Sequence, residues 1–446
     1  MIFSVVSIAL LMSSLDQTIV ATALHALQHG LHASINWASW TITVYSVGLL
    51  LALPVVGRLS DRYGRRRIFL ASAALFTASS LACGLAGNIY LLVVLRAVQA
   101  IGGAGFTPSA TGIVVDHFGD ARDKAVGLFG SIFPIGAILG PVLGGVFVTY
   151  WSWRGIFLVN VPVGVTLILL SLRYIPRDAA PGRARGRFDL TGMALLGVGA
   201  LAAMIAISYL GGEGAQAWSP LFVVPVAVAT VALGLFVRHV GRTADAFIPA
   251  RLLYGKGFGT VNVINVLFGG AAAGLGALIP LYAINRYGID VLDSGLLLSA
   301  RGVAVILCSS LAAFALRRTG YRRPMYVGFL LTGVGMLALS LAPIGLSAYA
   351  WLAVAAGVTG VGIGTANPAT RNASLQLAPE QSATIASLRT MGRQTGSITA
   401  ISIATAILAG SGDPGHAQAL VYGVFGLLLV AGLPLVARVP EHRGAW

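Results

Sequence analysis

The feature that most constrains this chain is a series of long apolar stretches separated by short polar segments. A helix needs about 20 mostly apolar residues to cross the hydrocarbon core of a bilayer. Helices satisfy their backbone polar groups internally, so such stretches predict an all-α polytopic membrane protein. The fourteen stretches that qualify are residues 2–24, 40–57, 68–87, 90–115, 124–149, 155–175, 188–210, 219–237, 258–284, 294–316, 324–343, 348–369, 383–409 and 418–437.

Composition supports the same class. Charged residues make up 10% of the chain, whereas soluble domains carry about 25%. The net charge of +15 comes from arginines that lie mainly between the apolar stretches, so we expect them to set topology and expect no nucleic-acid partner. Cys83 and Cys308 both lie inside apolar stretches, so we expect neither a disulfide framework nor a metal site.

The distribution of Lys and Arg predicts the orientation. With both termini in the cytoplasm, 23 of the 29 fall on the inner side, Arg371 among them. The outer side holds only Arg154 and Arg286, and four arginines lie within or near the stretches: Arg96, Arg301, Arg389 and Arg393. Cytoplasmic loops of membrane proteins are enriched in this way. We therefore predict fourteen transmembrane helices in a cytoplasmic membrane, with both termini inside.

An internal repeat suggests how the helices are grouped. The basic loop GRLSDRYGRRR follows the second stretch, and LRRTGYRRP follows the tenth, without the acid of the first copy. Stretches seven and eight then form an inserted pair. We predict a 6+2+6 arrangement: an N-terminal six-helix bundle (1–176), an inserted two-helix segment with basic flanks (177–256) and a C-terminal six-helix bundle (257–446). Paired repeats around a midplane site are typical of secondary transporters.

Asp16 is the only acid well inside an apolar stretch. Ionisable groups at such depth are costly and mark functional sites by default. Counting 1.5 Å per residue places Asp16 and Arg96 both on the order of 10 Å below the outer boundary. We expect the two to be coupled, directly or through water or Gln99, and assign them to proton coupling. The alternative is an acid that only pins two helices together.

Four segments lie in order in the expected stretches: Leu15–Val20, Gly57–Arg67, Arg96–Gly103 and Gly136–Gly145. Together they resemble the major facilitator superfamily, specifically its fourteen-span drug:proton antiporter family. The resemblance covers nearly the whole chain, and Ala100 replaces a glycine usual in the third segment. The start of the sixth helix, at Trp153-Arg154, Asn160 and Pro162, resembles this family too.

The resemblance implies a gating loop. Its residues are Gly57, Asp61, Gly64, Arg65 and Arg66. By resemblance, Asp61 contacts the inner start of helix thirteen, near Ser382 and Ala383, and closes the inner face while the outer face is open. A carboxylate suits this contact because it accepts hydrogen bonds from a helix N-terminus or an arginine. The alternative is a basic loop that only sets orientation.

Helix five carries the motif Gly136, Gly140, Pro141, Gly144 and Gly145. Residues four apart share one helix face, so three of these glycines permit close approach of another helix. Pro141 removes one backbone hydrogen bond and allows a bend. The resemblance makes this the hinge and seal between the two halves, and ordinary small-residue packing is the alternative.

Polar residues within the other stretches are candidates to bind substrate, although interhelical packing could explain each of them. The spans hold one acid against four arginines, so we expect neutral or weakly acidic amphiphiles to be favoured over dications. The candidates are Trp40, Tyr45, Gln99, Asn262, Asn265, Tyr282, Arg301, Arg393 and Gln394.

The sequence thus predicts proton-coupled efflux of lipophilic small molecules or drugs by alternating access. We expect a monomer in the lipid bilayer, driven by the proton gradient, with no cofactor, no metal and no enzymatic activity. An exporter of an endogenous lipid, siderophore or metabolite on the same fold is the alternative, because a fold does not settle a substrate.

Overall fold

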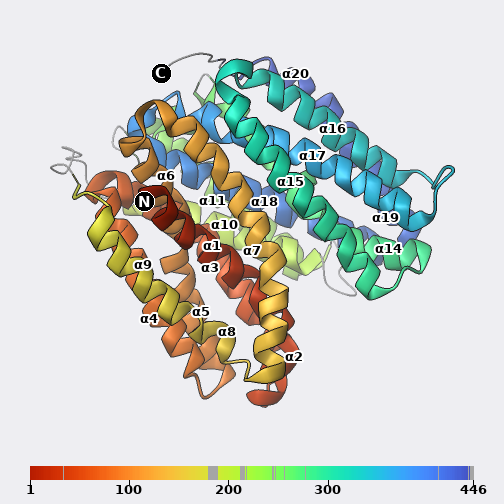
Figure 1. Ribbon diagram of the computed structural model, residues 1–446, viewed down its shortest axis with the longest axis horizontal. Helices are drawn as coiled ribbons and strands as arrows, with labels where there is room; N and C mark the ends of the chain where they lie inside the picture. The colour runs from red at the N-terminus through yellow and green to blue at the C-terminus, as the bar shows by residue number, and fades with distance from the viewer. Residues whose placement is uncertain are drawn as a thin grey trace. The chain divides into compact units, whose positions relative to one another are not determined.

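The chain is helical throughout its regular elements (Figure 1). The computed structural model describes residues 1–33, 35–178, 189–210, 216, 218–243, 246, 248–255, 257–276, 278–409, 411–439 and 441. These residues form two compact units: Met1–Gly186 with Ala378–Leu388, and Arg187–Leu377 with Arg389–Trp446. The sequence predicts a different division, into three segments with boundaries at 176 and 256. That division stays a prediction.

The first unit contains the helices up to the first basic linker and the start of α18. Its elements are α1 (Ile2–Thr22), α2 (Leu24–Gly30), α3 (Ile35–Tyr63), α4 (Arg65–Gly84), α5 (Ile89–Ala104), α6 (Phe106–His117), η1 (Gly119–Ala121), α7 (Arg122–Tyr150), α8 (Gly155–Leu158), α9 (Asn160–Tyr174), η3 (Pro379–Gln381) and the first turns of α18 (Ser382–Ala409).

The second unit contains the remaining helices. They are α10 (Leu190–Leu210), α11 (Pro220–Arg242), α12 (Ala250–Tyr254), α13 (Phe258–Gly269), the π-helix η2 (Gly270–Leu275), α14 (Ile279–Tyr287), α15 (Val291–Thr319), α16 (Arg322–Ser340), α17 (Ala348–Leu375), the rest of α18, α19 (Pro414–Ala431) and α20 (Leu433–Val436).

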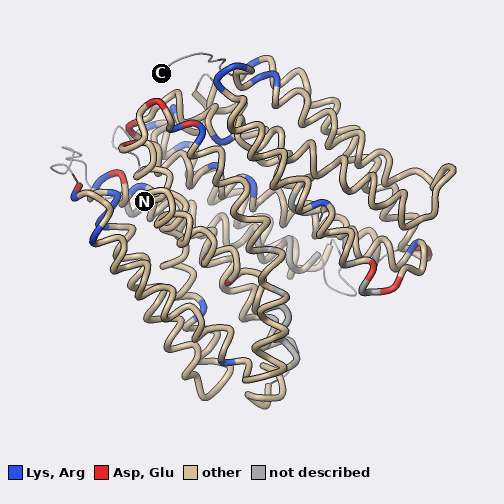
Figure 2. The backbone as a smooth tube through the Cα atoms, in the orientation of Figure 1, with Lys and Arg blue, Asp and Glu red and all other residues tan. Residues whose placement is uncertain are grey.

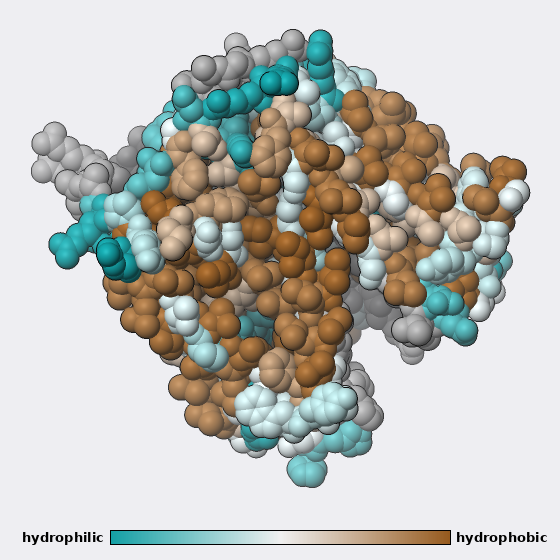
Figure 3. Space-filling view, viewed as in Figure 1, coloured by the Kyte–Doolittle hydropathy of each residue, from teal (hydrophilic) through white to brown (hydrophobic). Residues whose placement is uncertain are grey.

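Helices lie in each of the predicted apolar stretches. Within the described residues, eleven helical segments are long and apolar enough to cross a membrane. Helices α10, α13 and α18 are not among them, so the count of fourteen stays a prediction. On the face shown in Figure 3, apolar side chains cover the middle of the helices and hydrophilic ones gather at their ends. This is the pattern that a bilayer requires.

Most charged residues lie at or near helix ends, as Figure 2 shows. Arg317 and Arg318 close α15, and Arg322 and Arg323 open α16. Arg371 differs from its predicted place in a loop: α17 continues to Leu375 and buries it. The apolar signal stops before Arg371 because the last turns of α17 are polar, although they are still helical.

Two carboxylates cap the start of a helix that lies earlier in the chain. One follows α9 and the other follows α20. Asp178, after α9, accepts the backbone N–H groups of Arg66 and Arg67 at 2.8 and 3.1 Å. Glu441, after α20, accepts the N–H of Tyr321 at 2.8 Å. The first N–H groups of a helix have no partner within the helix, and an anion there also meets the positive end of the helix dipole. The two caps therefore fix where α4 and α16 begin.

The ninth predicted stretch is a broken helix, in which α13 and α14 are joined through the π-helix η2. Side chains donate to three backbone carbonyl groups in and beside this break. Arg301 donates to Ala272 O, the Tyr422 hydroxyl donates to Leu275 O at 3.0 Å, and Gln418 donates to Leu278 O at 2.8 Å. Irregular backbone at membrane depth is tolerated only where such partners exist.

Candidate functional site

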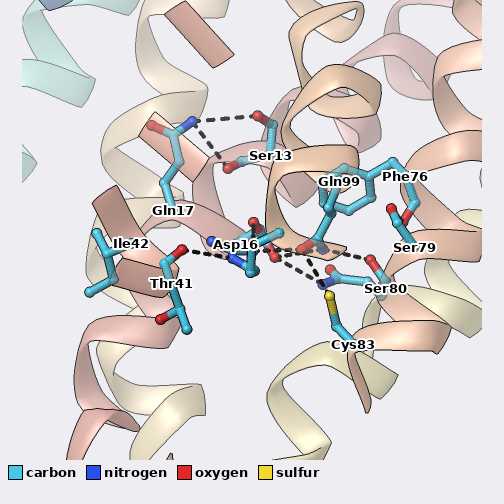
Figure 4. A network of polar contacts seen from close by, with 12 residues as sticks. Ser13, Asp16, Gln17, Thr41, Ile42, Phe76, Ser79, Ser80, Cys83 and Gln99 are labelled. Atoms are coloured by element: carbon cyan, nitrogen blue, oxygen red, sulfur yellow. Dashed lines mark hydrogen bonds and ion pairs between the residues drawn. The ribbon is translucent and has the colours of Figure 1, made fainter. Parts of the chain in front are cut away.

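Asp16 lies in the middle of α1 with no exposed surface. Its Oδ2 accepts a hydrogen bond from Arg96 Nη1 at 2.7 Å, which makes a buried ion pair. Its Oδ1 accepts from Gln99 Nε2 at 3.0 Å and from Asn160 Nδ2 at 3.4 Å. Figure 4 shows Asp16 and Gln99 in a network of polar contacts that also includes Ser80, Cys83 and Thr41. The structure thus brings helices α1, α5 and α9 together at one acid.

Arg96 has partners beyond Asp16. Its Nη1 donates to Gln99 Oε1 at 2.6 Å, and its Nε donates to the carbonyl oxygen of Thr41 at 3.2 Å. The guanidinium carbon lies 4.0 Å from the centre of the Tyr45 ring, a cation–π contact. Arg96 and Gln99 can act together because residues three apart share a helix face. The guanidinium is therefore held in place by several groups besides the carboxylate.

Gln99 connects the ion pair to α4, because its Nε2 also donates to Ser80 Oγ at 2.7 Å. Both Asp16 and Arg96 are removed from solvent, and each compensates the charge of the other. Removing one partner of such a pair leaves an uncompensated buried charge and costs about 3–5 kcal/mol. Replacing either residue by a neutral one would therefore leave the charge of the other without its partner.

The glycine face of α7, the helix of the fifth predicted stretch, packs on α1, which carries Asp16. Ser14 Oγ donates to Phe133 O at 2.8 Å, and Thr18 Oγ1 donates to Gly136 O at 3.2 Å. A Cβ added at Gly140 would collide with Thr18 and come within 3.2 Å of Ile19 N. The glycines thus let α7 approach α1 backbone to backbone within the first unit.

The other members of this motif differ in their surroundings. Gly144 is buried, and a Cβ at Gly145 would meet open space. The side chain of Pro141 lies outside the described part of the chain, although its backbone continues α7. The role of the motif as a seal between the two halves stays a prediction.

Asp61, in the last turn of α3, caps the start of α18. It accepts the N–H groups of Ala383 and Thr384 at 3.3 and 2.8 Å and the Thr384 hydroxyl at 2.8 Å. A side chain at Gly57 would collide with Ser387 and the carbonyl oxygen of Ala383. The contact that the resemblance implied is present, and it extends one residue further, to Thr384.

Of the other gating-loop residues, Arg65 lies beside this acid. Arg65 Nη2 lies 3.6 Å from Asp61, and Arg65 also pairs with Asp116 and donates to Gly112 O at 2.6 Å. Gly64 has φ +108°, a conformation that favours glycine. Arg66 Nη2 donates to Leu172 O at 2.8 Å.

The predicted substrate residues do not form one group. Tyr45 and Gln99 belong to the ion-pair network, whereas Trp40 is 48% exposed. In the second unit, Asn262 donates to Leu252 O and Leu253 O at 2.9 and 3.1 Å, which ties α13 to α12. The buried Tyr282 hydroxyl donates to Leu339 O at 2.7 Å.

Another three of the predicted residues lie along α13 and α18. Arg393 Nη1 donates to Asn367 Oδ1 at 3.1 Å, and Gln394 is half-buried beside it on α18. Asn265 on α13 is 2% exposed, and its Cβ lies 3.7 Å from the Cβ position of Gly392. Arg301 donates to the η2 backbone instead.

Sequence reasoning missed several participants. Asn160 stood out only as a family feature, and nothing in the sequence indicated that it reaches Asp16 from α9. The carbonyl of Thr41 could not be found from a side-chain pattern at all. Asn367, which accepts from two arginines, reads as one polar residue in an apolar helix.

Comparisons with known proteins agree with this architecture. The sequence profile of the Major Facilitator Superfamily matches residues 6–190 and 261–445. The methylenomycin A resistance protein of Streptomyces coelicolor is 30% identical over 97% of this chain and 91% of its own length. Multidrug resistance protein 3 of Bacillus subtilis is 29% identical over 80% of this chain and 69% of its own length.

Solved structures give the same fold. A human organic anion transporter superposes with a TM-score of 0.70 at 17% identity, over 98% of both chains. A proton:xylose symporter gives 0.69 at 14% identity, over 100% of this chain and 96% of its own. The predicted superfamily, the all-helical membrane fold and the non-enzymatic nature of the protein are thereby confirmed. The chain is a multi-pass membrane transporter that belongs to the Major Facilitator Superfamily.

Proposed function

We propose that this protein exports lipophilic small molecules, including drugs, across the cytoplasmic membrane in exchange for protons. It would work as a monomer of fourteen spans arranged 6+2+6, with both termini in the cytoplasm and no cofactor. The observation that carries the proposal is the fully buried pair of Asp16 and Arg96. The names of relatives at about 30% identity, which are antibiotic and multidrug resistance proteins, support the substrate class.

The pair suits a proton carrier because its two charges depend on one another. When Asp16 takes up a proton, its attraction for Arg96 falls to that of a neutral hydrogen bond. Arg96 then retains the Thr41 carbonyl, the Gln99 oxygen and the Tyr45 ring. The guanidinium therefore keeps these three contacts while the carboxylate is neutral.

The change at Asp16 can reach the rest of the first unit through α1. Ser14 and Thr18 flank Asp16 by two residues on either side, and both donate to carbonyl groups of α7. Because the glycines of α7 leave no soft side chains between the two backbones, a shift of α1 must move α7 or break these contacts. In alternating access, the Asp61 contact with α18 would then hold the inner closed state.

Reconstituted proteoliposomes with an imposed proton gradient test the proposal. We expect the wild-type protein to drive uphill transport of some members of a chemically diverse panel of lipophilic compounds. Asp16→Asn keeps the size of the side chain and should abolish gradient-driven accumulation while leaving downhill exchange of substrate partly intact. Asp290→Asn makes the same chemical change at an exposed site and serves as the matched control.

Uphill transport by Asp16→Asn with an unchanged pH profile would refute the coupling role. Transport confined to lipids, siderophores or other endogenous metabolites, with no drug transported, would favour the alternative exporter.

A further inference from the structure

A cluster of buried and half-buried arginines in the second unit has no role in the proposed proton site. Arg389 on α18 is 5% exposed, and its Nη2 donates to Asn367 Oδ1 at 3.0 Å and to Thr370 Oγ1 at 3.5 Å. Arg393, one turn later, donates to the same Asn367 oxygen at 3.1 Å. Two guanidinium groups therefore share one neutral acceptor on α17.

In the part of the chain that the structure describes, no carboxylate pairs with Arg389 or Arg393 as Asp16 pairs with Arg96. The donor nitrogens of Arg389 and Arg393 lie within about 6 Å of one another, because both contact one atom. Arg371 adds a third positive charge near Arg389. Like charges at this separation in a low-dielectric interior repel strongly, so the cluster favours a negative charge between them.

Neighbouring polar atoms are also available to a ligand. In the part of the chain that the structure describes, the buried Nε of Arg389 has no hydrogen-bond partner, and neither does the side-chain amide of Asn265. Asn265 faces α18 at Gly392, directly before Arg393. Buried polar groups are normally hydrogen-bonded, so such atoms need an explanation. An anion held by these arginines would supply an acceptor that Arg389 Nε lacks.

The depth of the cluster distinguishes a substrate from a lipid headgroup. Arg389 and Arg393 lie seven and eleven residues after Ser382, the first residue of α18. At 1.5 Å per residue these positions are about 10 and 16 Å along the helix, and half of the hydrocarbon core is about 15 Å. The Phe268 ring lies 5.6 Å from the Arg393 guanidinium and offers an apolar neighbour. Headgroups lie at the membrane boundary, so this position suits an amphipathic molecule that enters the protein.

We propose that Arg389, Arg393 and Asn265 bind the carboxylate, or an equivalent sulfonate, of an amphipathic monoanion. One anion oxygen would accept from each arginine, since guanidinium groups bind carboxylates in this manner. The apolar body would pack near Phe268. This assignment rests on the proposed transport function and deepens it by naming the substrate class.

Thermal unfolding of the full chain in detergent, with no proton gradient, tests the site. A ligand that binds only the folded protein raises the melting temperature according to its affinity. The probes are 4-butylbenzoate and the neutral 4-butylbenzamide, which have the same apolar body. We expect the benzoate to stabilise the wild type more than the amide does. Arg389→Gln and Arg393→Gln should each weaken benzoate binding at least tenfold, whereas Arg318→Gln, an exposed arginine at the end of α15, should not.

Asn367→Asp is the sharpest variant, because it places a carboxylate isosteric with the amide beside both arginines. We expect its melting temperature without ligand to rise and its response to butylbenzoate to disappear. This variant keeps the test valid if the arginine variants do not fold. Equal stabilisation of the wild type by the acid and the amide would overturn the proposal, as would unchanged benzoate binding by Asn367→Asp.

Nanodiscs provide a further arm. If phosphatidylglycerol, added to phosphatidylcholine nanodiscs, stabilises the wild type but not Asn367→Asp, and butylbenzoate does not, the ligand is a lipid headgroup and the substrate assignment is wrong. Failure of these binding tests leaves the proton-driven transport assay of Asp16→Asn unaffected, and failure of that assay leaves the binding tests unaffected.

Discussion

Replacing Asp61 by Asn should open the contact between α3 and the start of α18. The carboxylate accepts three hydrogen bonds there, from two backbone N–H groups and one hydroxyl, and lies near Arg65. Asn retains one acceptor oxygen, and its NH2 group would face a backbone donor. Hydrogen bonds to a charged group contribute about 1.5–3 kcal/mol each and neutral ones about 0.5–1.5. Loss of one charged bond and weakening of the others therefore costs about 2–4 kcal/mol.

A change of about 1.4 kcal/mol is tenfold in an equilibrium constant, so the open fraction should rise roughly 30- to 700-fold until it saturates. Ser387 reports on this equilibrium, because it is completely buried against Gly57 when the contact is closed. In a Cys83→Ala, Cys308→Ala background, the cysteine of Ser387→Cys should react slowly with a maleimide. The added Asp61→Asn change should accelerate that reaction in proportion to the open fraction, and transport should slow.

Asp120→Asn, an exposed acid in η1, controls for the loss of one negative charge and should leave the labelling rate unchanged. A labelling rate within twofold of the parent in the Asp61→Asn protein would refute the reasoning. The loop would then be a topology signal only, even though its contact with α18 is present.

Three further outcomes are expected. Gly140→Leu should abolish transport or make the protein leak protons, since the leucine side chain would collide with Thr18. Gly145→Ala should be tolerated, because a side chain there faces open space. Equal transport by both variants would reduce the motif to generic packing. Asp178→Ala should lower the free energy of unfolding by about 0.5–2 kcal/mol through loss of the α4 cap, measured by thermal unfolding, and an unchanged melting temperature would contradict this. Cysteines at Asp120 and Arg318 should react with an impermeant maleimide only from the cytoplasm, and those at Trp218 and Gly345 only from outside; the reverse pattern would invert the topology.

Much of the ion-pair site could be predicted, because two different signals point to it. Asp16 is conspicuous in an apolar stretch, and counting residues gave Arg96 the same depth. The structure places them in direct contact, with Gln99 bridging as well. Depth along the membrane normal is readable from sequence, since a helix rises by a fixed amount per residue.

Rotation about the helix axis and the partner of each face are not readable in this way. Asn160 reaches Asp16 from 144 positions away, and Asn262 turns back to α12 instead of facing a common pocket. The π-helix η2 was equally hidden, because hydropathy does not report which carbonyl groups have partners. Arg371 shows the converse problem, in that a polar helix end resembles a loop.

The two copies of the predicted repeat share the capping carboxylates but not the acid of the gating loop. Asp178 and Glu441 give each copy the same contact, in which a carboxylate after the final helix caps the start of an earlier helix. The acid of the gating loop exists only in the first copy, since residues 316–324 contain none. The caps stabilise helix starts and can persist through a transport cycle, whereas the role proposed for Asp61 requires its contact with α18 to break in each cycle. If the contact of Asp61 with α18 breaks in each cycle, only the first copy has to supply the free energy for breaking such a contact.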